Sequence, residues 1–438
     1  MSYLDSYTPQ SGTSEVRVTH YDLDLDYDIL PNTLRARAVL DARVLEDCSA
    51  LSLDLEGLTV ERVLVNGQPS SFKQAKTKLV VDARERFSVD EALTLEIHYG
   101  GTPTPASGAW GDIGWEELSD GVLVAGQPVG ADTWFPCNDH PSQKATFRVT
   151  VLVDSDYTAI SNGELVSVDS RGPRTAWTWE SREPVATYLA TVQMGQYRRG
   201  SVEPGSYPPA RVPLTLACGE HLWSQAQHVL AKQHAMMSVF EQRFGAYPFG
   251  YYGVVVTDDE LEIPLESQPL SIFGPNHMTE SWESERLIAH EMAHQWFGNS
   301  LTPASWSDIW LNEGFAHYAE WVWSEASGRR SAHEEALSAH AELSGSKQKV
   351  VIGDPGPKKM FDDRVYVRGA LTLNALRMAV GDQTFFTILQ RWTGQNRCSN
   401  VTTTDFLALA SKVSGRPVEP LLHDWLFEKK LPALPETS

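Results

Sequence analysis

Two histidines and a glutamate with the spacing of a metal site lie in one short segment, His290-Glu291-Met292-Ala293-His294. The apolar periodicity around this segment predicts a helix over residues 283–297. Histidines at positions i and i+4 share one helix face, about 5–6 Å apart at Cβ, so both imidazoles can bind one ion. Glu291 lies one position around the helix, where its carboxylate would reach a metal-bound water and act as general base. Two histidines on an amphipathic helix could otherwise be core residues.

A third ligand is available in Glu313, which follows His294 after eighteen intervening residues. It belongs to a second predicted helix, residues 308–327. Two histidines and one glutamate leave the fourth tetrahedral position open for water, which is typical of a catalytic zinc and not of a structural one. We therefore expect His290, His294 and Glu313 to bind one Zn²⁺ per chain.

Two neighbours of Glu313 could support this site without binding the metal. His317 lies four residues further along the helix, but as a fourth protein ligand it would leave no room for the water, so we interpret it as a packing residue or a partner of a ligand. Asp308 could hold the second N–H of a ligand histidine, or it could interact with the helix dipole. The sequence favours neither role for Asp308.

The composition of the 438-residue chain is that of a globular protein with more than one domain: 42% of the residues are hydrophobic and 21% are charged. The net charge of −21 would repel a phosphate backbone and an anionic membrane surface, so neither nucleic acid nor a membrane is expected as a partner. No apolar run is long enough to span a membrane, and the first residues do not resemble a secretion signal. The four cysteines have no CxxC spacing and indicate reduced thiols. We therefore expect a cytoplasmic protein.

The first 200 residues alternate between apolar and polar types, which predicts strands. In the clearest example, from Tyr21 to Ile29, the apolar residues alternate with aspartates. A turn at residues 30–33 and a second alternating run at 34–43 predict a hairpin in which arginines face aspartates. Because alternation spreads the carboxylates along one strand face, a solvated face is favoured over a calcium site. Further strands are predicted at 51–55, 58–65, 79–81, 93–99, 147–153, 175–179 and 188–192.

The composition changes at residues 198–209, which are rich in proline and glycine and indicate a domain boundary. Helical patterns dominate beyond this point and must position the metal ligands. We therefore predict an α+β protein with an all-β domain at residues 1–200 and a mostly helical catalytic domain at residues 201–438. Strands are predicted at 251–257 and 261–267, and helices at 221–244, 283–297, 308–327, 331–344, 363–380, 382–393, 404–414 and 418–429.

At the metal-site residues the sequence resembles the aminopeptidase-N-like gluzincin family of zinc metallopeptidases, whose zinc motif reads HExxH, eighteen residues, then Glu. The segments HEMAHQWFGNSLTP from His290 and WLNEGFAHY from Trp310 match the family's core, and the likeness extends from Tyr21 to Phe427. The resemblance implies a saddle-like β domain followed by a thermolysin-like catalytic domain, in a two-domain form that lacks the family's C-terminal domains. It also implies a zinc-dependent aminopeptidase that hydrolyses N-terminal residues from peptide substrates.

The resemblance carries over further positions that would contact the substrate. The family's catalytic tyrosine matches Tyr366, whose O–H would stabilise an oxyanion; the alternative is a tyrosine in the helix core. Of the segment that binds the substrate amine only Glu266 is retained, and the preceding Pro264 fits an edge strand. A second amine-binding glutamate of the family aligns with Val129. Amine binding would therefore depend on Glu266 with help from Gln127.

Two other functions stay open at this point. An epoxide-hydrolysing branch of the same family uses the same zinc site. A non-catalytic, peptide-binding protein on this scaffold would be expected to have lost a catalytic group. The groups in question are all present, namely Glu291, Tyr366, His290, His294 and Glu313.

Overall fold

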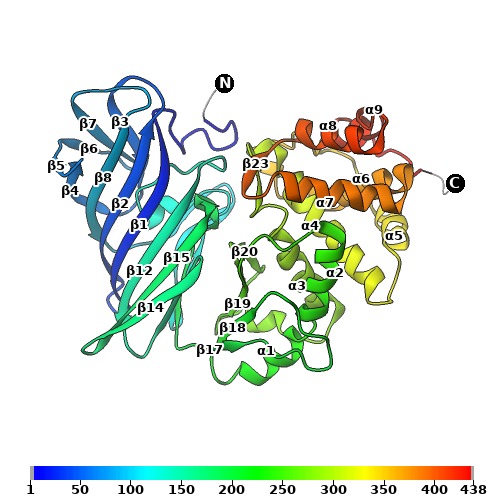
Figure 1. Ribbon diagram of the computed structural model, residues 1–438, viewed down its shortest axis with the longest axis horizontal. Helices are drawn as coiled ribbons and strands as arrows, with labels where there is room; N and C mark the ends of the chain where they lie inside the picture. The colour runs from blue at the N-terminus through cyan, green and yellow to red at the C-terminus, as the bar shows by residue number, and fades with distance from the viewer. Residues whose placement is uncertain (1–3, 436–438) are drawn as a thin grey trace.

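The computed structural model describes residues 4–435, with the side chain of Arg84 excepted. Figure 1 shows the strands of the first half on one side of the molecule and the helices of the second half on the other. The predicted α+β class, with a β-rich region followed by a mostly helical one, is therefore confirmed.

The largest layer of the first half is an eight-stranded sheet with the order β14-β15-β12-β1-β2-β8-β4-β5. Along β1 (Val16–Asp28) the apolar side chains of Tyr21, Leu23 and Leu25 are buried, as the alternation predicts. The other strands of this sheet are β2 (Thr33–Val44), β4 (Thr59–Val65), β5 (Gln68–Pro69), β8 (Ala92–Gly101), β12 (Lys144–Asp154), β14 (Glu164–Arg171) and β15 (Arg174–Ala186).

The polar face of the β1–β2 hairpin has the predicted charge pairing. Asp24 lies opposite Arg37 and Asp26 lies opposite Arg35 in the strand register. Their ion pairs measure 3.1 Å and 3.4 Å, and Arg35 also contacts Asp28 at 2.9 Å. Cross-strand pairs of opposite charge stabilise such a sheet modestly.

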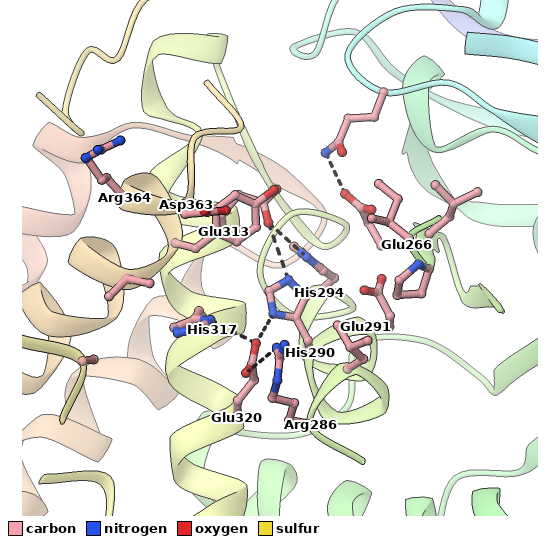
Figure 2. Close-up of a pocket in the computed structure, with 18 of the residues that line it drawn as sticks. Glu266, Arg286, His290, Glu291, His294, Glu313, His317, Glu320, Asp363 and Arg364 are labelled. Atoms are coloured by element: carbon pink, nitrogen blue, oxygen red, sulfur yellow. Dashed lines mark hydrogen bonds and ion pairs between the residues drawn. The ribbon is translucent and has the colours of Figure 1, made fainter. Parts of the chain in front are cut away.

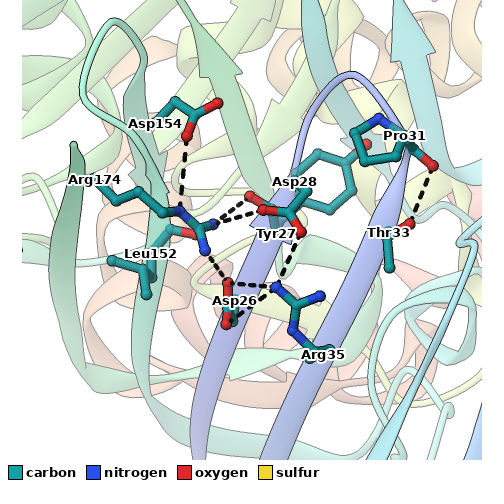
Figure 3. A network of polar contacts seen from close by, with 9 residues as sticks. All are labelled: Asp26, Tyr27, Asp28, Pro31, Thr33, Arg35, Leu152, Asp154 and Arg174. Carbon is teal, nitrogen blue, oxygen red and sulfur yellow. Dashed lines mark hydrogen bonds and ion pairs between the residues drawn. The ribbon is translucent and has the colours of Figure 1, made fainter.

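Arg174, at the start of β15, extends this network from a different strand, as Figure 3 shows. Its guanidinium contacts the carboxylate of Asp26 and lies 3.8 Å from that of Asp154. It also donates to the backbone carbonyls of Tyr27, at 2.7 Å, and Leu152, at 2.8 Å. The exposed ladder of Asp24, Asp26, Asp28, Arg35, Arg37 and Arg174, called the hairpin ladder below, is thus neutralised by the protein's own side chains.

Two smaller sheets complete the first half, with the orders β3-β7-β6 and β13-β16-β11-β10-β9. The strand predicted at 188–192 is wrong, since the 3₁₀ turn η2 (Thr187–Leu189) occupies its start and β16 (Val192–Gly195) begins only at its end. The Leu189 carbonyl accepts a hydrogen bond from the Asn162 side chain instead of a neighbouring strand. The remaining elements are β3 (Cys48–Asp54), β6 (Phe72–Gln74), β7 (Lys78–Phe87), β9 (Ala106–Gly108), β10 (Gly111–Leu118), β11 (Gly121–Ala125), η1 (Ala131–Thr133) and β13 (Thr158–Ser161).

The second half contains a five-stranded sheet with the order β17-β18-β19-β21-β20. The strand after Pro264, β20, lies at the edge of this sheet, which confirms the predicted edge position. The five strands are β17 (Arg198–Ser201), β18 (Leu214–Cys218), β19 (Tyr252–Val256), β20 (Leu265–Ser267) and β21 (Leu270–Phe273).

Helices cover the rest of the second half and follow the predicted ranges closely, with one exception. The helix predicted over 221–244 is divided into α1 (Trp223–Leu230) and α2 (Gln233–Phe244), because the His234 N–H bonds the carbonyl of Ala231 three residues back. The other elements are η3 (Pro275–His277), α3 (Trp282–His294), β22 (Leu301–Pro303), η4 (Trp306–Asp308), α4 (Trp310–Ala326), α5 (Ala332–Ser344), η5 (Pro357–Lys359), α6 (Asp363–Val380), α7 (Asp382–Gln395), β23 (Ser399–Val401), α8 (Thr403–Ser414) and α9 (Glu419–Phe427).

Helix α4 packs between α3 and α6. The crossing of α4 and α6 is formed by Gly314 and Gly369, whose backbones are in contact: a Cβ atom added to Gly314 would lie 2.7 Å from the Cα of Gly369. Any larger residue at either position would therefore have to separate the two helices. Within residues 4–435, no helix is long and apolar enough to cross a membrane.

Candidate active site

Helix α3 places the two motif histidines side by side in the interior. Ser281 caps the helix by accepting a hydrogen bond from the N–H of Ser284 at 3.2 Å. One turn apart on the same face, His290 and His294 have ring centroids 4.8 Å apart. Both side chains are almost fully buried, although they line a cleft of about 630 Å³. The predicted spacing therefore brings both imidazoles to one point of the cleft wall.

Helix α4 adds the third group from the opposite side, as Figure 2 shows. Glu313 Oε2 lies 3.6 Å from His290 Nε2 and 3.5 Å from His294 Nε2. The three donor atoms lie within 4.8 Å of one another, so a single ion could contact them all. Two imidazole nitrogens and one carboxylate oxygen form a donor set that suits Zn²⁺ and leaves a position open toward the cleft.

The electrostatics of this cluster also favour a cation. Burial raises the pKa of Glu313, but the two histidines outweigh it and lower that pKa to about 2. Burial lowers the pKa of His294, but the carboxylates of Glu266 and Glu313 raise it to about 9. The buried carboxylates therefore create a negative potential at the point where the imidazole nitrogens meet.

Glu320 holds one of the histidines from behind, and the sequence analysis missed it. Its Oε1 atom lies 2.8 Å from His290 Nδ1 and 3.0 Å from His317 Nδ1, while Arg286 donates to its Oε2 at 3.2 Å. His317 thus contacts this supporting carboxylate, one step further from the metal site than the predicted partner of a ligand. Glu320 lies seven residues after Glu313, two turns along the same helix face, which is the signal that could have identified it.

His294 is oriented by backbone instead of by a carboxylate. Its Nδ1 atom lies 3.0 Å from the carbonyl oxygen of Phe297, in the turn that follows α3. Gly298 completes this turn at φ 114°, and a Cβ there would lie 3.3 Å from His294 Nδ1. The turn therefore needs glycine for both its conformation and its close approach.

The possible role of Asp308 in holding a ligand histidine is wrong. Its Oδ1 atom accepts hydrogen bonds from the N–H and the hydroxyl of Thr403, at 3.2 Å and 2.5 Å. Thr403 is the first residue of α8. Asp308 therefore connects η4 to a different helix start and does not contact the metal ligands.

Glu291 extends into the cleft beside the three donors and has the geometry of a general base. Its Oε2 atom is buried and has no hydrogen-bond partner among the residues that the structure describes. Burial raises the pKa of this carboxyl group to about 7, although the neighbouring histidines lower it. An orphaned, buried carboxylate oxygen needs a polar partner, and a water molecule in the cleft would supply one.

Glu266 and Gln127 meet on the far side of the cleft. Glu266 lies on the edge strand β20, and its Oε1 atom accepts a 2.6 Å hydrogen bond from the side-chain amide of Gln127. Burial raises the pKa of Glu266, with the carboxylate of Glu313 adding to the effect and the two histidines opposing it. Gln127, which the sequence led us to expect beside Glu266 in amine binding, thus contacts Glu266 directly.

The β-rich region also holds the turn beneath the ligands. Lys144, at the start of β12, is buried and donates from Nζ to the carbonyls of Asn299 and Ser300 and to the hydroxyl of Thr302, at 2.8–2.9 Å. Burial lowers the pKa of Lys144 to about 7. The Asn299 side chain in turn donates to the carbonyl of Ser267 at 3.0 Å, next to Glu266. Both halves of the chain therefore position the cleft.

Tyr366 lies in the first turn of α6 and lines the same cleft. Its ring is 6.0 Å from that of His290 between centroids, at an interplanar angle of 23°. Burial raises the pKa of its hydroxyl well above the usual value, and the carboxylates of Glu313, Glu266 and Glu291 add to this effect. The phenol therefore keeps its proton and can donate a hydrogen bond into the cleft.

Two family models match the chain. The Peptidase M1 N-terminal domain matches residues 17–189, and the Peptidase family M1 domain matches residues 229–425. The second segment contains all the cleft residues described above except Gln127 and Lys144.

Individual relatives agree with this match. Tricorn protease-interacting factor F2 of Thermoplasma acidophilum is 25% identical over 446 residues, which cover 96% of the chain and 54% of that protein. The chain spans about half the length of the curated relatives it matches. The crystal structure of an M1 zinc metallopeptidase from Deinococcus radiodurans is 31% identical, with a TM-score of 0.90 and complete coverage of both chains. A mutant M1 zinc metallopeptidase from the same organism, bound to a Tyr-Ser-Ala substrate, is 30% identical with the same TM-score and coverage.

Proposed function

The chain belongs to the M1 family of peptidases, and we propose that it is a zinc-dependent aminopeptidase that releases N-terminal residues from peptides. One observation carries the proposal: a single cleft holds an open three-donor metal site, an unpartnered carboxylate beside it and a second carboxylate, Glu266, on an edge strand. The peptide bound to the similar Deinococcus metallopeptidase supports a peptide substrate.

His290, His294 and Glu313 would hold the zinc ion, and Glu320 and the Phe297 carbonyl would fix the two imidazoles. Zinc, when bound, supplies a Lewis acid that polarises a carbonyl group and makes water nucleophilic near neutral pH. The protein's own contribution is the rest of the cleft, which must bind the peptide, take up a proton and stabilise developing charge.

Glu291 and Tyr366 would perform the proton transfer and the charge stabilisation. The free Oε2 atom of Glu291 would take a proton from the attacking water and pass it to the leaving amine. The Tyr366 hydroxyl would donate a hydrogen bond to the oxygen of the scissile carbonyl as negative charge develops there. Both groups line the same cleft as the three ligands, as this division of roles requires.

Glu266, supported by Gln127, would select the chain terminus. A protonated α-amine bound to this carboxylate forms a charge-assisted hydrogen bond and places the first peptide bond near the metal site. The edge of β20 can pair with the substrate backbone as an added strand. Together these contacts favour cleavage after the first residue over cleavage within the chain.

The two alternative functions have less support. A non-catalytic scaffold would leave the buried Oε2 atom of Glu291 without a purpose, because a buried and unpaired carboxylate is costly. Several curated relatives that match the chain bear aminopeptidase names, among them Aminopeptidase N of Lactococcus lactis, which favours peptide bonds over epoxides as the substrate. We also propose that the chain consists of two domains, residues 1–200 and residues 201–438. A cytoplasmic location is proposed as well, supported by the four free cysteines.

A matched pair of substrates tests the proposed function. Zinc-loaded protein should hydrolyse a tripeptide with a free amine, and N-acetylation of the same tripeptide should abolish cleavage. Chelation should stop the reaction and added zinc should restore it. Equal cleavage of the acetylated tripeptide would contradict the aminopeptidase assignment, and failure to cleave either peptide in metal-replete protein would contradict peptidase activity.

A further inference from the structure

A second cavity, of about 510 Å³, lies between the β-rich region and the five-stranded sheet of the second half. One side is formed by β13, β14 and β15 and the other by β17, β18, β19 and β21. Of these, β14 and β15 on one side and β17, β18 and β19 on the other are labelled in the lower part of Figure 1. The cavity shares no lining residue with the cleft of the metal site. Junctions between domains are common places for small-molecule sites, and this volume lies in the range of such sites.

The cavity is hollow because glycines line it where side chains would otherwise fill it. A Cβ atom added to Gly253 would lie 3.2 Å from Leu270 Cβ, and one added to Gly250 would lie 3.0 Å from Glu164 Oε1, so both would enter the cavity. A Cβ atom on Gly200 would instead point at Trp223, which does not line the cavity. Around them the surface is mainly apolar, with Ile160, Leu165, Trp179, Leu216, Val254, Val255 and Leu270 among the lining residues. An apolar ligand body would therefore bury its surface favourably here.

One cation at this cavity has no anionic partner. The Arg199 guanidinium packs over the indole rings of Trp179 and Trp177, 5.0 Å and 5.8 Å from their centroids. The residue is exposed to solvent, and among residues 4–435 it makes no side-chain hydrogen bond or ion pair. Partial burial of the guanidinium lowers its pKa. A guanidinium that is held in place by aromatic rings and has no carboxylate partner in the protein can bind the carboxylate of a ligand.

The neighbouring residue, Arg198, differs from Arg199 because it has an anionic partner. Arg198 packs over Trp223 at 4.0 Å, as Arg199 packs over its own indoles, but its guanidinium is also paired with Glu220 at 2.8 Å. Successive side chains of a strand point to opposite faces, so only Arg199 faces the cavity. The two residues therefore form a natural matched pair for testing what an unpaired arginine does here.

The other charged residue that lines the cavity, Glu164, determines how an anionic ligand would be oriented there. Glu164 lies next to Gly250, where its Oε1 atom would be 3.0 Å from an added Cβ. It has no ion pair among the described residues and would repel an anion at that end of the cavity. A ligand carboxylate is thus favoured at Arg199 and disfavoured at Glu164.

We propose that this cavity binds a small carboxylic acid with an apolar body, with the carboxylate on Arg199 and the body between Trp179 and Leu270. The proposal is independent of the aminopeptidase function. Leu270 pairs with Ser267 in the β20–β21 hairpin, adjacent to Glu266, so a bound acid would contact the hairpin that carries the proposed amine anchor.

Calorimetric titration of the zinc-loaded full chain with 3-phenylpropionate, and with 3-phenylpropionamide as its uncharged match, tests the proposal. The acid should bind with one site per chain and at least about tenfold more tightly than the amide, because only the acid can pair with the guanidinium. Because a carboxylate could also bind the zinc ion, the titration is repeated on the metal-free chain, where unchanged affinity for the acid excludes the metal cleft as its site.

The two arginines provide the decisive comparison. Arg199→Gln should weaken binding of the acid by about tenfold or more, whereas Arg198→Gln, which removes a neighbouring charge of the same sign, should leave it within about twofold. Arg199→Lys should restore part of the affinity, which shows that a charge and not the fold was lost. Equal affinity for acid and amide, unchanged binding in Arg199→Gln, or an equal loss in Arg198→Gln would overturn the proposal.

Discussion

The hairpin ladder and the metal-site cleft both concentrate carboxylates, but they differ in what balances the charge. In the ladder each aspartate faces an arginine of the same protein at the surface, so the fold supplies its own counter-ions (Figure 3). In the cleft the carboxylates of Glu266, Glu291, Glu313 and Glu320 gather around three histidines, and one of the two lining arginines, Arg286, pairs with Glu320 (Figure 2). The comparison teaches that carboxylates indicate a metal site where the fold buries several of them around imidazoles, with fewer arginine and lysine partners than carboxylates.

The largest effect is expected from removing the Glu313 carboxylate from the cleft. Glu313→Gln should lose most of the bound zinc and lower kcat/KM by about 10⁴-fold, since the ion and the Lewis acid it supplies depart together. Elemental analysis and peptide hydrolysis measure the two effects. Asp26→Asn in the ladder is the matched control and should change neither quantity. Full zinc content in Glu313→Gln would contradict the ligand assignment.

Glu291 tests whether chemistry can be lost while the metal stays. Glu291→Gln should keep about one zinc per chain but lower kcat by about 10²–10⁴-fold, because the base acts on water and does not bind the ion. Zinc content and single-turnover rates on the same protein sample separate the two roles. If this variant lost its zinc, Glu291 would have to be counted among the ligands.

Tyr366 tests the transition-state role of an uncharged group in the same cleft. Tyr366→Phe should lower kcat by about 10²–10³-fold with a much smaller change in KM, since the hydroxyl would act chiefly when charge develops on the substrate oxygen. The thermal midpoint should stay close to that of the wild type. Near-native kcat in this variant would reduce the tyrosine to a packing role.

Glu320 sharpens the comparison, because it is a carboxylate that the fold does supply with partners. Glu320→Gln should weaken zinc affinity by about 10–100-fold, since it leaves the His290 imidazole less firmly oriented and less basic. Competition with a chelator measures the affinity directly. Asp308→Asn should leave it unchanged, because that carboxylate bonds Thr403 instead. Equal zinc affinities in wild type and Glu320→Gln would show that this support is dispensable.

The smallest effects are expected in the hairpin ladder. Arg35→Gln should lower the free energy of unfolding by about 0.5 kcal/mol or less, since its ion pairs are solvent-exposed and screened by salt. Arg174→Gln should cost more, about 1–2 kcal/mol, because its partly buried guanidinium also bonds two backbone carbonyls. Urea unfolding at low and high salt measures both. A larger loss for Arg35 than for Arg174 would contradict this ranking.

The sequence predicted the parts of the molecule in which spacing and geometry are directly related. The helix period places His290 and His294 together, and the strand period pairs Asp26 with Arg35. Asp308 shows the limit, because its partner Thr403 lies ninety-five residues away and only the packing of α8 brings them into contact. The interruption between α1 and α2 was missed for another reason: no glycine or proline marks it.

The backbone contact between Gly314 and Gly369 restricts how this protein could be engineered. Replacing a helical glycine with alanine is a general route to higher thermal stability, since alanine gains about 0.5–1 kcal/mol in a helix interior. Here that route is closed, because a methyl group at either position would displace α4, which carries Glu313, from α6, which carries Tyr366. Thermostabilised variants must therefore be sought elsewhere in the chain.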